Sequence, residues 1–586
     1  MENIKYPKCH KENYPRPSFV RDSFLDLNGP WDFYLDRNND GLSKNLQNGF
    51  SGYQTIKVPY SYETKASTIN VKEMVKSVFY SKDVVFSKED LTKDVLLNLE
   101  GSDYITSVYV NGVKVGTEEG CYHRITFNLS PYLKLGKNNI TIHCLDDYSC
   151  DRIRGKQRWM DKEFGCWYTQ TTGIYKPVWI EKVDKIHLVS LKITPSLEDE
   201  SVTFNLVPSV PSDCLEAQIT ISFNNKLIRK VSALLGETEV DIKTTLGSSK
   251  MDFLTDLWSV DRPKLYDVEI NLLYNNKSVD LVKTYFGLRD IKTDGNKILL
   301  NNIPIYLKTV LDQGYFKDSG LTALNEKALL EDILIMKQMG FNGARKHQKI
   351  EDERYYYYAD VLGFLTWLEI PSMYNFNSIS QTKYLTELTK IIKQFHNYTS
   401  IMTYVPFNES WGVKHIYENH KEQQFTLAIY YLLKSLDSSR LVISNDGWEH
   451  TVSDILTLHH YEQDALKLAH YYENLDKQIS GDLKNHQKLP YCDGFGYNGE
   501  PIMLSEFGGT SFEKDKNKGW GYGCTVKDDA EYIERLRSLV NAAKEMPNVV
   551  GFCYTQLTDV EQEVNGLLTE DRKPKVDIKI IKDIID

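Results

Sequence analysis

The sequence predicts a multidomain protein in which two all-β sandwiches precede a (β/α)8 TIM barrel. The 586 residues exceed what one hydrophobic core holds, so several domains are expected. Up to about residue 287, short runs of alternating apolar and polar residues are separated by turn signals, which is typical of β-sandwiches. Beyond this point strand-like runs alternate with amphipathic helical runs, which favours a barrel.

Residues 1–183 are predicted to form a jelly-roll β-sandwich. Asn111-Gly112 joins two alternating segments there, and this dipeptide supplies the positive φ angles of a tight hairpin. Residues 184–287 contain further alternating runs, and their length suits a seven-stranded immunoglobulin-like sandwich. We expect both sandwiches to be structural domains that border the active site.

Residues 288–586 are predicted to form the barrel. Amphipathic helices are expected at residues 325–339, 420–436 and 527–544. Barrel enzymes carry their catalytic groups at the carboxyl ends of the strands, so residues at these ends are the candidates for chemistry. The eight expected strands are residues 303–311, 342–347, 365–370, 401–407, 441–445, 455–461, 501–506 and 549–555.

The composition argues against several classes of partner and cofactor. A net charge of -11 argues against nucleic acid, and no basic run suggests a membrane surface. The N-terminus lacks the apolar stretch of a signal peptide, and no run of about 18 apolar residues occurs, so a cytoplasmic location is expected. The nine cysteines include no C-x-x-C pair, so neither a disulfide framework nor a zinc site is predicted.

Two glutamates, Glu409 and Glu506, are the candidate catalytic residues. Each ends a short run that reads as a buried strand, and a glycine-containing loop follows. Cleavage of a glycosidic bond needs two carboxyl groups, because one protonates the leaving group while the other attacks or stabilises the anomeric carbon. Alone, either glutamate could be a capping or solvent-exposed group. Placed on the fourth and seventh strands of one predicted barrel, the pair predicts a glycoside hydrolase.

Other polar residues at the strand ends are candidates for substrate binding. Asn408 precedes Glu409, and its amide could bind the sugar hydroxyl next to the anomeric centre. Arg345 and His347 lie at the end of the second strand, and Glu369 ends the third. For these three residues the alternative is a buried salt bridge that supports the barrel.

The end of the sixth strand and two loops add aromatic candidates. His459 and His460 are adjacent on a strand and point to opposite faces, so a shared metal ion is not expected. One of them is expected to line the site beside Tyr461, which can hydrogen-bond the nucleophile. Trp448 and Trp520 lie in loops on the same side of the barrel, where each could form a sugar platform or pack locally.

Several short motifs occur along the chain in an order that resembles one enzyme family. They include Leu27-Asn28-Gly29-Pro30-Trp31-Asp32-Phe33, Thr172-Gly173-Ile174-Tyr175, Gly340-Phe341-Asn342-Gly343-Ala344-Arg345, Asn408-Glu409, Ser505-Glu506 and Asn565-Gly566-Leu567-Leu568. With these motifs the chain resembles glycoside hydrolase family 2, the group of β-galactosidases, β-glucuronidases and β-mannosidases. The resemblance implies that Glu409 is the acid/base, that Glu506 is the nucleophile and that Tyr461 lies beside it. It implies no metal ion and no organic cofactor.

The chain departs from the family where relatives contact the sugar. The family's glucuronidases carry an Asn-x-Lys pair before the closing motif, whereas residues 561–566 contain no lysine and two glutamates, which would repel a uronate. Trp167 stands where familiar galactosidases and glucuronidases place an Asp. Asp312 ends the first strand where many relatives have His-Glu. Lys516 and Lys518 are the only nearby cations that the sequence suggests as substitutes.

The sequence therefore favours a retaining exo-β-glycosidase that acts on a neutral glycone such as galactose. A pentosidase or furanosidase and a β-glucuronidase of the same family are the alternatives. A non-catalytic carbohydrate-binding protein on the same scaffold is a remote alternative, because both glutamates are present. Transfer of the glycosyl group to a sugar acceptor instead of water stays open. The expected partner is a carbohydrate, and a homo-oligomer is compatible with the sequence.

Overall fold

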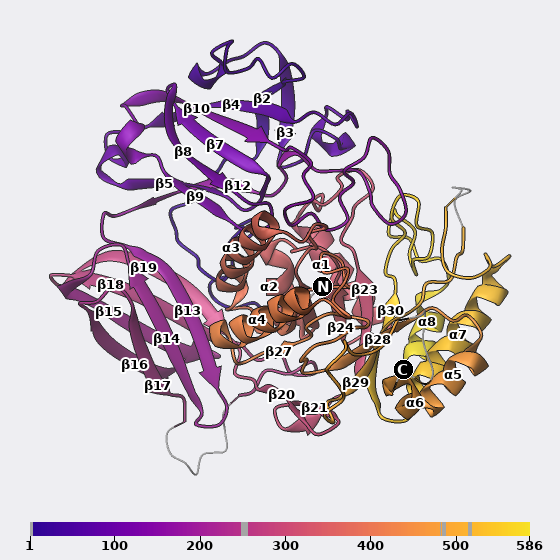
Figure 1. Cartoon of the computed structure of the whole chain (residues 1–586). Helices are drawn as coiled ribbons and strands as arrows, with labels where there is room; N and C mark the ends of the chain where they lie inside the picture. The colour runs from indigo at the N-terminus through magenta and orange to yellow at the C-terminus, as the bar shows by residue number, and fades with distance from the viewer. Residues whose placement is uncertain (1–3, 248–255, 481, 483–487, 514–518) are drawn as a thin grey trace.

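A computed structural model shows two β-sandwiches and a barrel, which confirms the predicted fold class (Figure 1). In Figure 1 the first sandwich, coloured indigo to purple, lies above the barrel, and the second lies to its lower left. The structure describes all residues except 1–3, 248–255, 481, 483–487 and 514–518.

The first sandwich consists of two antiparallel sheets with the strand orders β3-β2-β4-β10-β7-β8 and β1-β12-β5-β9, beside a short β6-β11 pair. Asn111 and Gly112 have φ angles of 51° and 84° and form the predicted hairpin turn between β7 and β8. The strands are β1 Leu25–Asp26, β2 Gly29–Leu35, β3 Gln54–Val58, β4 Ser77–Phe86, β5 Asp94–Leu99, β6 Ser102–Asp103, β7 Ile105–Val110, β8 Val113–Glu119, β9 Ile125–Asn128, β10 Gly136–Leu145, β11 Gly173–Ile174 and β12 Val178–Val183.

Among its described residues, which exclude 248–255, the second sandwich has the seven strands that the sequence predicts, in sheets of order β13-β14-β17 and β16-β15-β18-β19. Alternate side chains of both sheets are buried between them, for example Phe204, Ile219 and Ile270. The strands are β13 Leu188–Ser196, β14 Ser201–Pro208, β15 Ser212–Phe223, β16 Lys226–Leu235, β17 Val240–Thr245, β18 Tyr266–Tyr274 and β19 Lys277–Phe286.

The barrel contains eight parallel strands in the order β27-β26-β25-β24-β23-β30-β29-β28. Three short antiparallel strands, β20 Ile291–Asp294, β21 Lys297–Leu300 and β22 Ile303–Pro304, precede it. The barrel strands are β23 Leu307–Asp312, β24 Gly343–Lys346, β25 Leu365–Glu369, β26 Ile401–Val405, β27 Leu441–Val442, β28 Leu456–His460, β29 Ile502–Gly508 and β30 Val549–Thr555.

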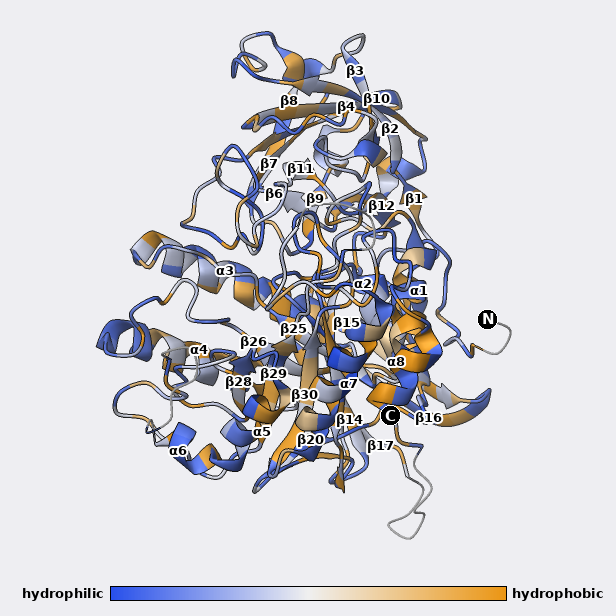
Figure 2. Cartoon of the chain, turned by 90° about the vertical axis from the view of Figure 1, so that its right-hand side faces the viewer, coloured by the Kyte–Doolittle hydropathy of each residue, from blue (hydrophilic) through white to orange (hydrophobic). Residues whose placement is uncertain are grey.

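Helices alternate with the barrel strands as predicted. The last helix, which is mainly orange in Figure 2, buries Ile581, Ile584 and Ile585 against its neighbours. Among the described residues no helix has the length and apolar character needed to cross a membrane. The helices are α1 Glu326–Gln338, α2 Glu353–Leu362, α3 Ser378–Phe395, α4 His420–Leu436, α5 Ala465–Glu473, α6 Leu475–Ile479, α7 Asp529–Glu545 and α8 Ile578–Ile585.

Two predicted strands differ from the structure. The run 303–311 is split, because residues 303–304 pair with β21 and only the later residues enter the barrel as β23. The run 441–445 keeps only its first two residues as β27. Asn445 instead accepts a hydrogen bond at Oδ1 from the amide of Ser410, and the Asp446 amide donates to the Phe407 carbonyl at 2.8 Å. These bonds divert the chain toward the end of β26.

A long connection between β10 and β12 brings the first sandwich against the barrel. The amides of Arg154 and Gly155 donate to the Ser372 carbonyl, which follows β25, at 2.9 and 3.1 Å. Lys176 donates from Nζ to the Glu351 carbonyl at 3.0 Å. Part of this connection therefore lies where a barrel carries its catalytic residues.

Candidate active site

Glu409 lies in a tightly held turn after β26. Its φ angle is 49° and that of Ser410 is 60°, a backbone conformation that side chains with a Cβ rarely adopt. The turn is held by two hydrogen bonds from its own amides, one from Glu409 to the Asp446 carbonyl at 2.9 Å and one from Ser410 to the Asn445 side chain, also at 2.9 Å. Backbone conformations of this kind concentrate at functional sites.

Glu506 lies opposite His459 on neighbouring parallel strands. The two residues are register partners on β29 and β28, so their side chains project in the same direction. Nε2 of His459 lies 3.5 Å from Oε1 of Glu506, and its Nδ1 lies 2.8 Å from Oε1 of Glu409. Tyr461 donates a hydrogen bond to Oε2 of Glu506. The ends of β26, β28 and β29 thus bring both candidate catalytic carboxylates to one imidazole.

Arg345 is the central cation of the site and is fully buried. Its Nη1 lies 2.7 Å from Oε1 of Glu506 and 2.6 Å from Oδ2 of Asp446. Its Nε lies 2.6 Å from Oε2 of Glu369, and its Nη2 donates to Oδ1 of Asn408 at 2.7 Å. One planar guanidinium therefore fixes three carboxylates and the amide that precedes Glu409.

The charges in this network set the protonation of its members. Burial alone would raise the pKa of Glu506, but the positive charges of His459 and Arg345 hold it below its usual value. Burial alone would lower the pKa of His459, but the negative charges of Glu506 and Asp446 raise it to about 10. At neutral pH Glu506 is therefore an anion, and His459 is a cation that donates from both ring nitrogens.

The two candidate carboxylates are close enough to act on one bond. Glu409, His459 and Glu506 each offer an atom within 4.8 Å of the others. Such a group could hold a metal ion in principle. However, Arg345 already pairs with Glu506, and His459, whose pKa the surrounding carboxylates raise to about 10, would have to release a proton to bind a metal. The arrangement favours carboxylate chemistry.

Two predicted binding residues lie behind this layer. Glu369 is fully buried, and besides Arg345 it contacts His347, whose Nδ1 lies 3.1 Å from Oε1. Asp312 lies 2.7 Å from Nζ of Lys346, which is its register partner on β24. These ion pairs match the structural alternative that the sequence left open for Glu369, and they account for Asp312 in the same way. Contact of either residue with substrate stays a prediction.

The three predicted tryptophans reach the site through ring contacts. Trp448 packs edge-on against His459, with ring centroids 5.6 Å apart. Trp167 packs on Trp411 at 5.4 Å, and Trp411 lies 6.3 Å from His347. Trp520 contacts Tyr522, which stacks on Tyr461 at 3.4 Å. All three tryptophans are half-buried. Their role as sugar platforms stays a prediction.

Sequence reasoning missed one polar residue of the site and singled out another only as one of a pair. Asp446, which follows the short β27, was missed although it obeys the same strand-end rule as Glu409. His459 was expected only as one of two histidines. The suggested cations Lys516 and Lys518 lie outside the described residues.

A polar cluster surrounds Glu563 near the end of β30. Its Oε2 accepts hydrogen bonds from the Tyr168 hydroxyl, from Nε2 of Gln313 at 2.7 Å and from Nε2 of Gln556 at 3.2 Å. Tyr168 comes from the first sandwich, whereas the other residues belong to the barrel. Glu563, one of the two glutamates expected to repel a uronate, is thus a buried acceptor with fixed partners.

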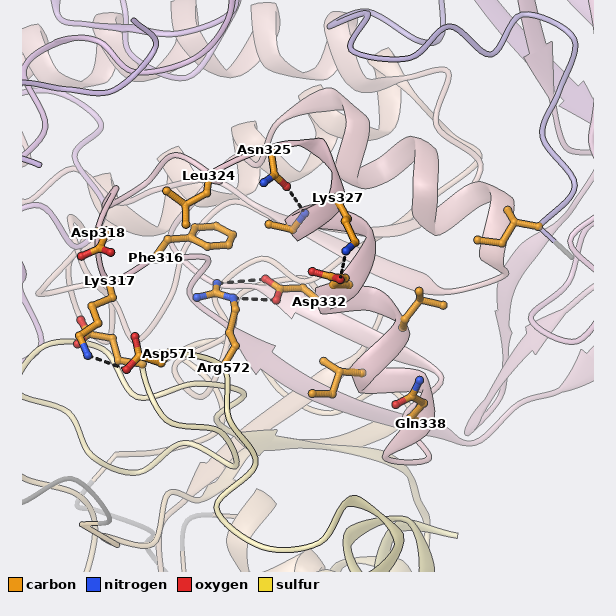
Figure 3. A pocket seen from close by; sticks show the side chains of 16 residues that line it. Phe316, Lys317, Asp318, Leu324, Asn325, Lys327, Asp332, Gln338, Asp571 and Arg572 are labelled. Carbon is orange, nitrogen blue, oxygen red and sulfur yellow. Dashed lines mark hydrogen bonds and ion pairs between the residues drawn. The ribbon is translucent and has the colours of Figure 1, made fainter. Parts of the chain in front are cut away.

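A separate cavity of about 990 Å³ lies beside α1 (Figure 3). Asp332 and Arg572 form an ion pair within it, and the Arg572 guanidinium lies 3.6 Å from the centre of the Phe316 ring. None of the predicted site residues lines this cavity. Its size alone does not connect it with the chemistry.

Comparisons with known proteins agree with the fold and cover nearly the whole chain. Residues 24–182 match the family model described as "Glycosyl hydrolases family 2, sugar binding domain", residues 186–289 match "Glycosyl hydrolases family 2", and residues 291–586 match "Glycosyl hydrolases family 2, TIM barrel domain". A crystal structure of the β-glucuronidase from Ruminococcus gnavus has a TM-score of 0.79 at 17% identity, with 100% of each chain covered, and so shares the fold.

Curated relatives are named for two different sugars. A β-glucuronidase from Streptococcus agalactiae is 23% identical, with 97% of each chain covered. A β-galactosidase from Leuconostoc mesenteroides is 22% identical over 82% of this chain and 47% of its own. The chain spans about half the length of some of the curated relatives that it matches. From the family models, which together cover nearly all of its sequence, the chain belongs to glycoside hydrolase family 2.

Proposed function

We propose that the protein is a retaining exo-β-glycosidase, with Glu506 as nucleophile and Glu409 as general acid and base. The observation that carries this proposal is the short separation of the two carboxylates, of which one oxygen from each lies within 4.8 Å of the other. Retaining glycosidases hold their carboxyl groups about 5 to 5.5 Å apart, whereas inverting enzymes leave room for a water molecule between them.

The neighbours of each glutamate suit its role. Glu506 is anionic and oriented by Arg345 and Tyr461, so one of its oxygens can attack the anomeric carbon as the glycosidic bond breaks. Glu409 has a side chain 20% exposed, so it can give its proton to the departing oxygen. In the second step Glu409 takes a proton from water, whose oxygen displaces Glu506 from the sugar.

The glycone that we propose is a β-glucuronide. A relative that matches over nearly the whole length of both chains is named a β-glucuronidase, and so is a structure with the same fold. This supports an alternative of the sequence analysis rather than its first choice, a neutral hexose. A β-galactoside remains the second candidate, because residues 561–566 contain two glutamates, which would repel a uronate but not a neutral sugar.

A panel of nitrophenyl glycosides tests the proposal. We expect the purified protein to release nitrophenol from the β-glucuronide with a kcat/KM at least tenfold above that for the β-galactoside and the β-glucoside. NMR of the first sugar product distinguishes retention from inversion. A neutral hexoside as the best substrate would overturn the choice of sugar, and initial release of the α-anomer would overturn the roles of the glutamates.

A further inference from the structure

Lys156 is a buried cation that has no hydrogen-bond or ion-pair partner among the described residues. The residue is only 6% exposed, and its ammonium makes no hydrogen bond or ion pair with any residue that the structure describes. Its Nζ lies 5.8 Å from the centre of the Tyr168 ring. An ammonium group removed from water without acceptors is costly, so a buried lysine of this kind is expected to receive an acceptor from elsewhere.

The backbone holds Lys156 against the barrel. The amide of the preceding Gly155 donates to Ser372, and the Lys156 carbonyl accepts from the Tyr168 amide at 2.8 Å. Gly155 has a φ angle of 61°, and a Cβ at this position would lie 2.3 Å from the Gln348 carbonyl oxygen. The backbone of Lys156 is therefore held in place by the hydrogen bond of Gly155 to Ser372 and by its own hydrogen bond with Tyr168.

The negative charges of the candidate catalytic carboxylates affect the pKa of Lys156. Burial would lower its pKa, but the negative charge of Glu563 and, more weakly, those of Glu506 and Glu409 raise it above the usual value. Burial lowers the pKa of His347 and Glu369 opposes this effect, while the ammonium of Lys156 lowers the pKa further. Lys156 therefore stays charged, and its ammonium lies over the ring of Tyr168, whose hydroxyl donates to Glu563.

Glu563 does not take the role of partner. No carboxylate among the described residues lies within the 4.0 Å of an ion pair with Lys156. Oε2 of Glu563 accepts hydrogen bonds from Tyr168, Gln313 and Gln556. An acceptor carried by a substrate could approach the ammonium, while Glu563 stays engaged with its own donors.

We propose that Lys156 determines the sugar specificity by binding the C6 carboxylate of a glycone whose anomeric carbon lies at Glu506. This inference rests on the proposed function and adds to it a residue from the first sandwich. It replaces the cation that the family's glucuronidases carry in the segment equivalent to residues 561–566. The barrel would then supply the catalytic residues, and the first sandwich would supply the residue that binds the negative charge of the sugar.

The test compares two substrates that differ only at C6, nitrophenyl β-D-glucuronide and nitrophenyl β-D-glucoside. Lys156→Met should lower kcat/KM for the glucuronide by about a hundredfold, because loss of one partner of a buried charge pair is costly. The value for the glucoside should change by less than about threefold. Lys162→Met is the matched control, since Lys162 is an exposed lysine of the same connection, and it should change neither value.

Two further measurements distinguish an error in the role of Lys156 from an error in the proposed function. Lys156→Arg keeps the charge and should retain a preference for the glucuronide, and calorimetry with free glucuronate should show weaker binding to Lys156→Met than to the wild type. Equal losses on both substrates, or unchanged glucuronate affinity, would make Lys156 a structural residue and overturn the inference while the proposed function stands. A wild-type protein that cleaves only neutral glycosides would overturn the proposed function itself.

Discussion

The Nδ1 atom of His459 lies 2.8 Å from Oε1 of Glu409. The same imidazole contacts Glu506 through its other nitrogen, so one cation adjoins both candidate catalytic carboxylates. Together with Arg345 it contacts four carboxylates, those of Glu369, Glu409, Asp446 and Glu506. Formation of a glycosyl ester at Glu506 removes one negative charge from this group, and the return of water restores it. The site therefore has its two fixed cations in place before the reaction begins.

We predict that His459 stabilises the fold in a pH-dependent way. Its pKa is raised from 6.5 to about 10 by the surrounding carboxylates, so the folded state holds this proton more tightly than the unfolded state. The resulting stability is fully present below about pH 6.5 and is lost as the pH rises through about 10. Urea unfolding of the wild type and His459→Gln should show the largest difference at about pH 6. A difference that is constant up to pH 10 would contradict this protonation.

The two glutamates should separate kinetically. Glu506→Gln should abolish turnover of every substrate, because no nucleophile remains. Glu409→Ala should slow substrates with poor leaving groups far more than activated aryl glycosides, since a good leaving group needs no proton. The slope of log kcat/KM against leaving-group pKa measures this, and it should steepen in Glu409→Ala. Parallel slopes for the wild type and the variant would remove Glu409 as the acid.

Tyr461→Phe should lower kcat by about 10- to 100-fold. The hydroxyl donates to Oε2 of Glu506, and a hydrogen bond to a charged group contributes about 1.5 to 3 kcal/mol. The variant keeps the ring that stacks on Tyr522 at 3.4 Å, so its melting temperature should stay close to that of the wild type. A loss of less than about threefold at saturating substrate would show that Arg345 alone orients the nucleophile.

The fold could be predicted because its signals are local. The alternation of apolar and polar residues, the Asn111-Gly112 turn and the helical spacing of apolar residues each involve residues that are close together in the sequence. The structure confirms the fold class that these patterns predict. The differences arise where distant contacts decide. The predicted strand 441–445 is short because residues of the turn after β26 take its hydrogen bonds. Local propensity cannot report such competition.

The site could be predicted only where its residues lie at the carboxyl ends of the barrel strands. Strand ends point to Glu409, Glu506 and Arg345, which the structure brings into one network. The same rule applied to the fifth strand would have found Asp446. Lys156 could not be found in this way, because it belongs to a different domain, and its neighbours Arg154 and Gly155 contact the loop after β25. Its position depends on how two domains pack, which no local pattern encodes.

The last prediction concerns the glycine that lets this connection approach the barrel. Gly155→Ala places a Cβ 2.3 Å from the Gln348 carbonyl, so the backbone around Lys156 must move. Gly295 is the matched control: it also has a positive φ, 51°, but nothing lies within 4 Å of a Cβ there. Both substitutions carry the cost of a left-handed alanine, about 1 to 2 kcal/mol. Any additional loss of stability in Gly155→Ala therefore measures the effect of the close approach of residue 155 to the Gln348 carbonyl.

We expect Gly155→Ala to be less stable than Gly295→Ala by a further 1 to 3 kcal/mol, roughly the cost of overpacking, in urea unfolding at neutral pH. It should also lower kcat/KM for the glucuronide more than for the glucoside, because the displaced segment carries Lys156. Gly295→Ala should leave the ratio of the two values unchanged, since it lies in the turn between β20 and β21. Equal stabilities of the two variants would show that the connection adapts to the methyl group. Equal losses of kcat/KM on both substrates would show that the segment supports the site but does not determine which sugar is bound.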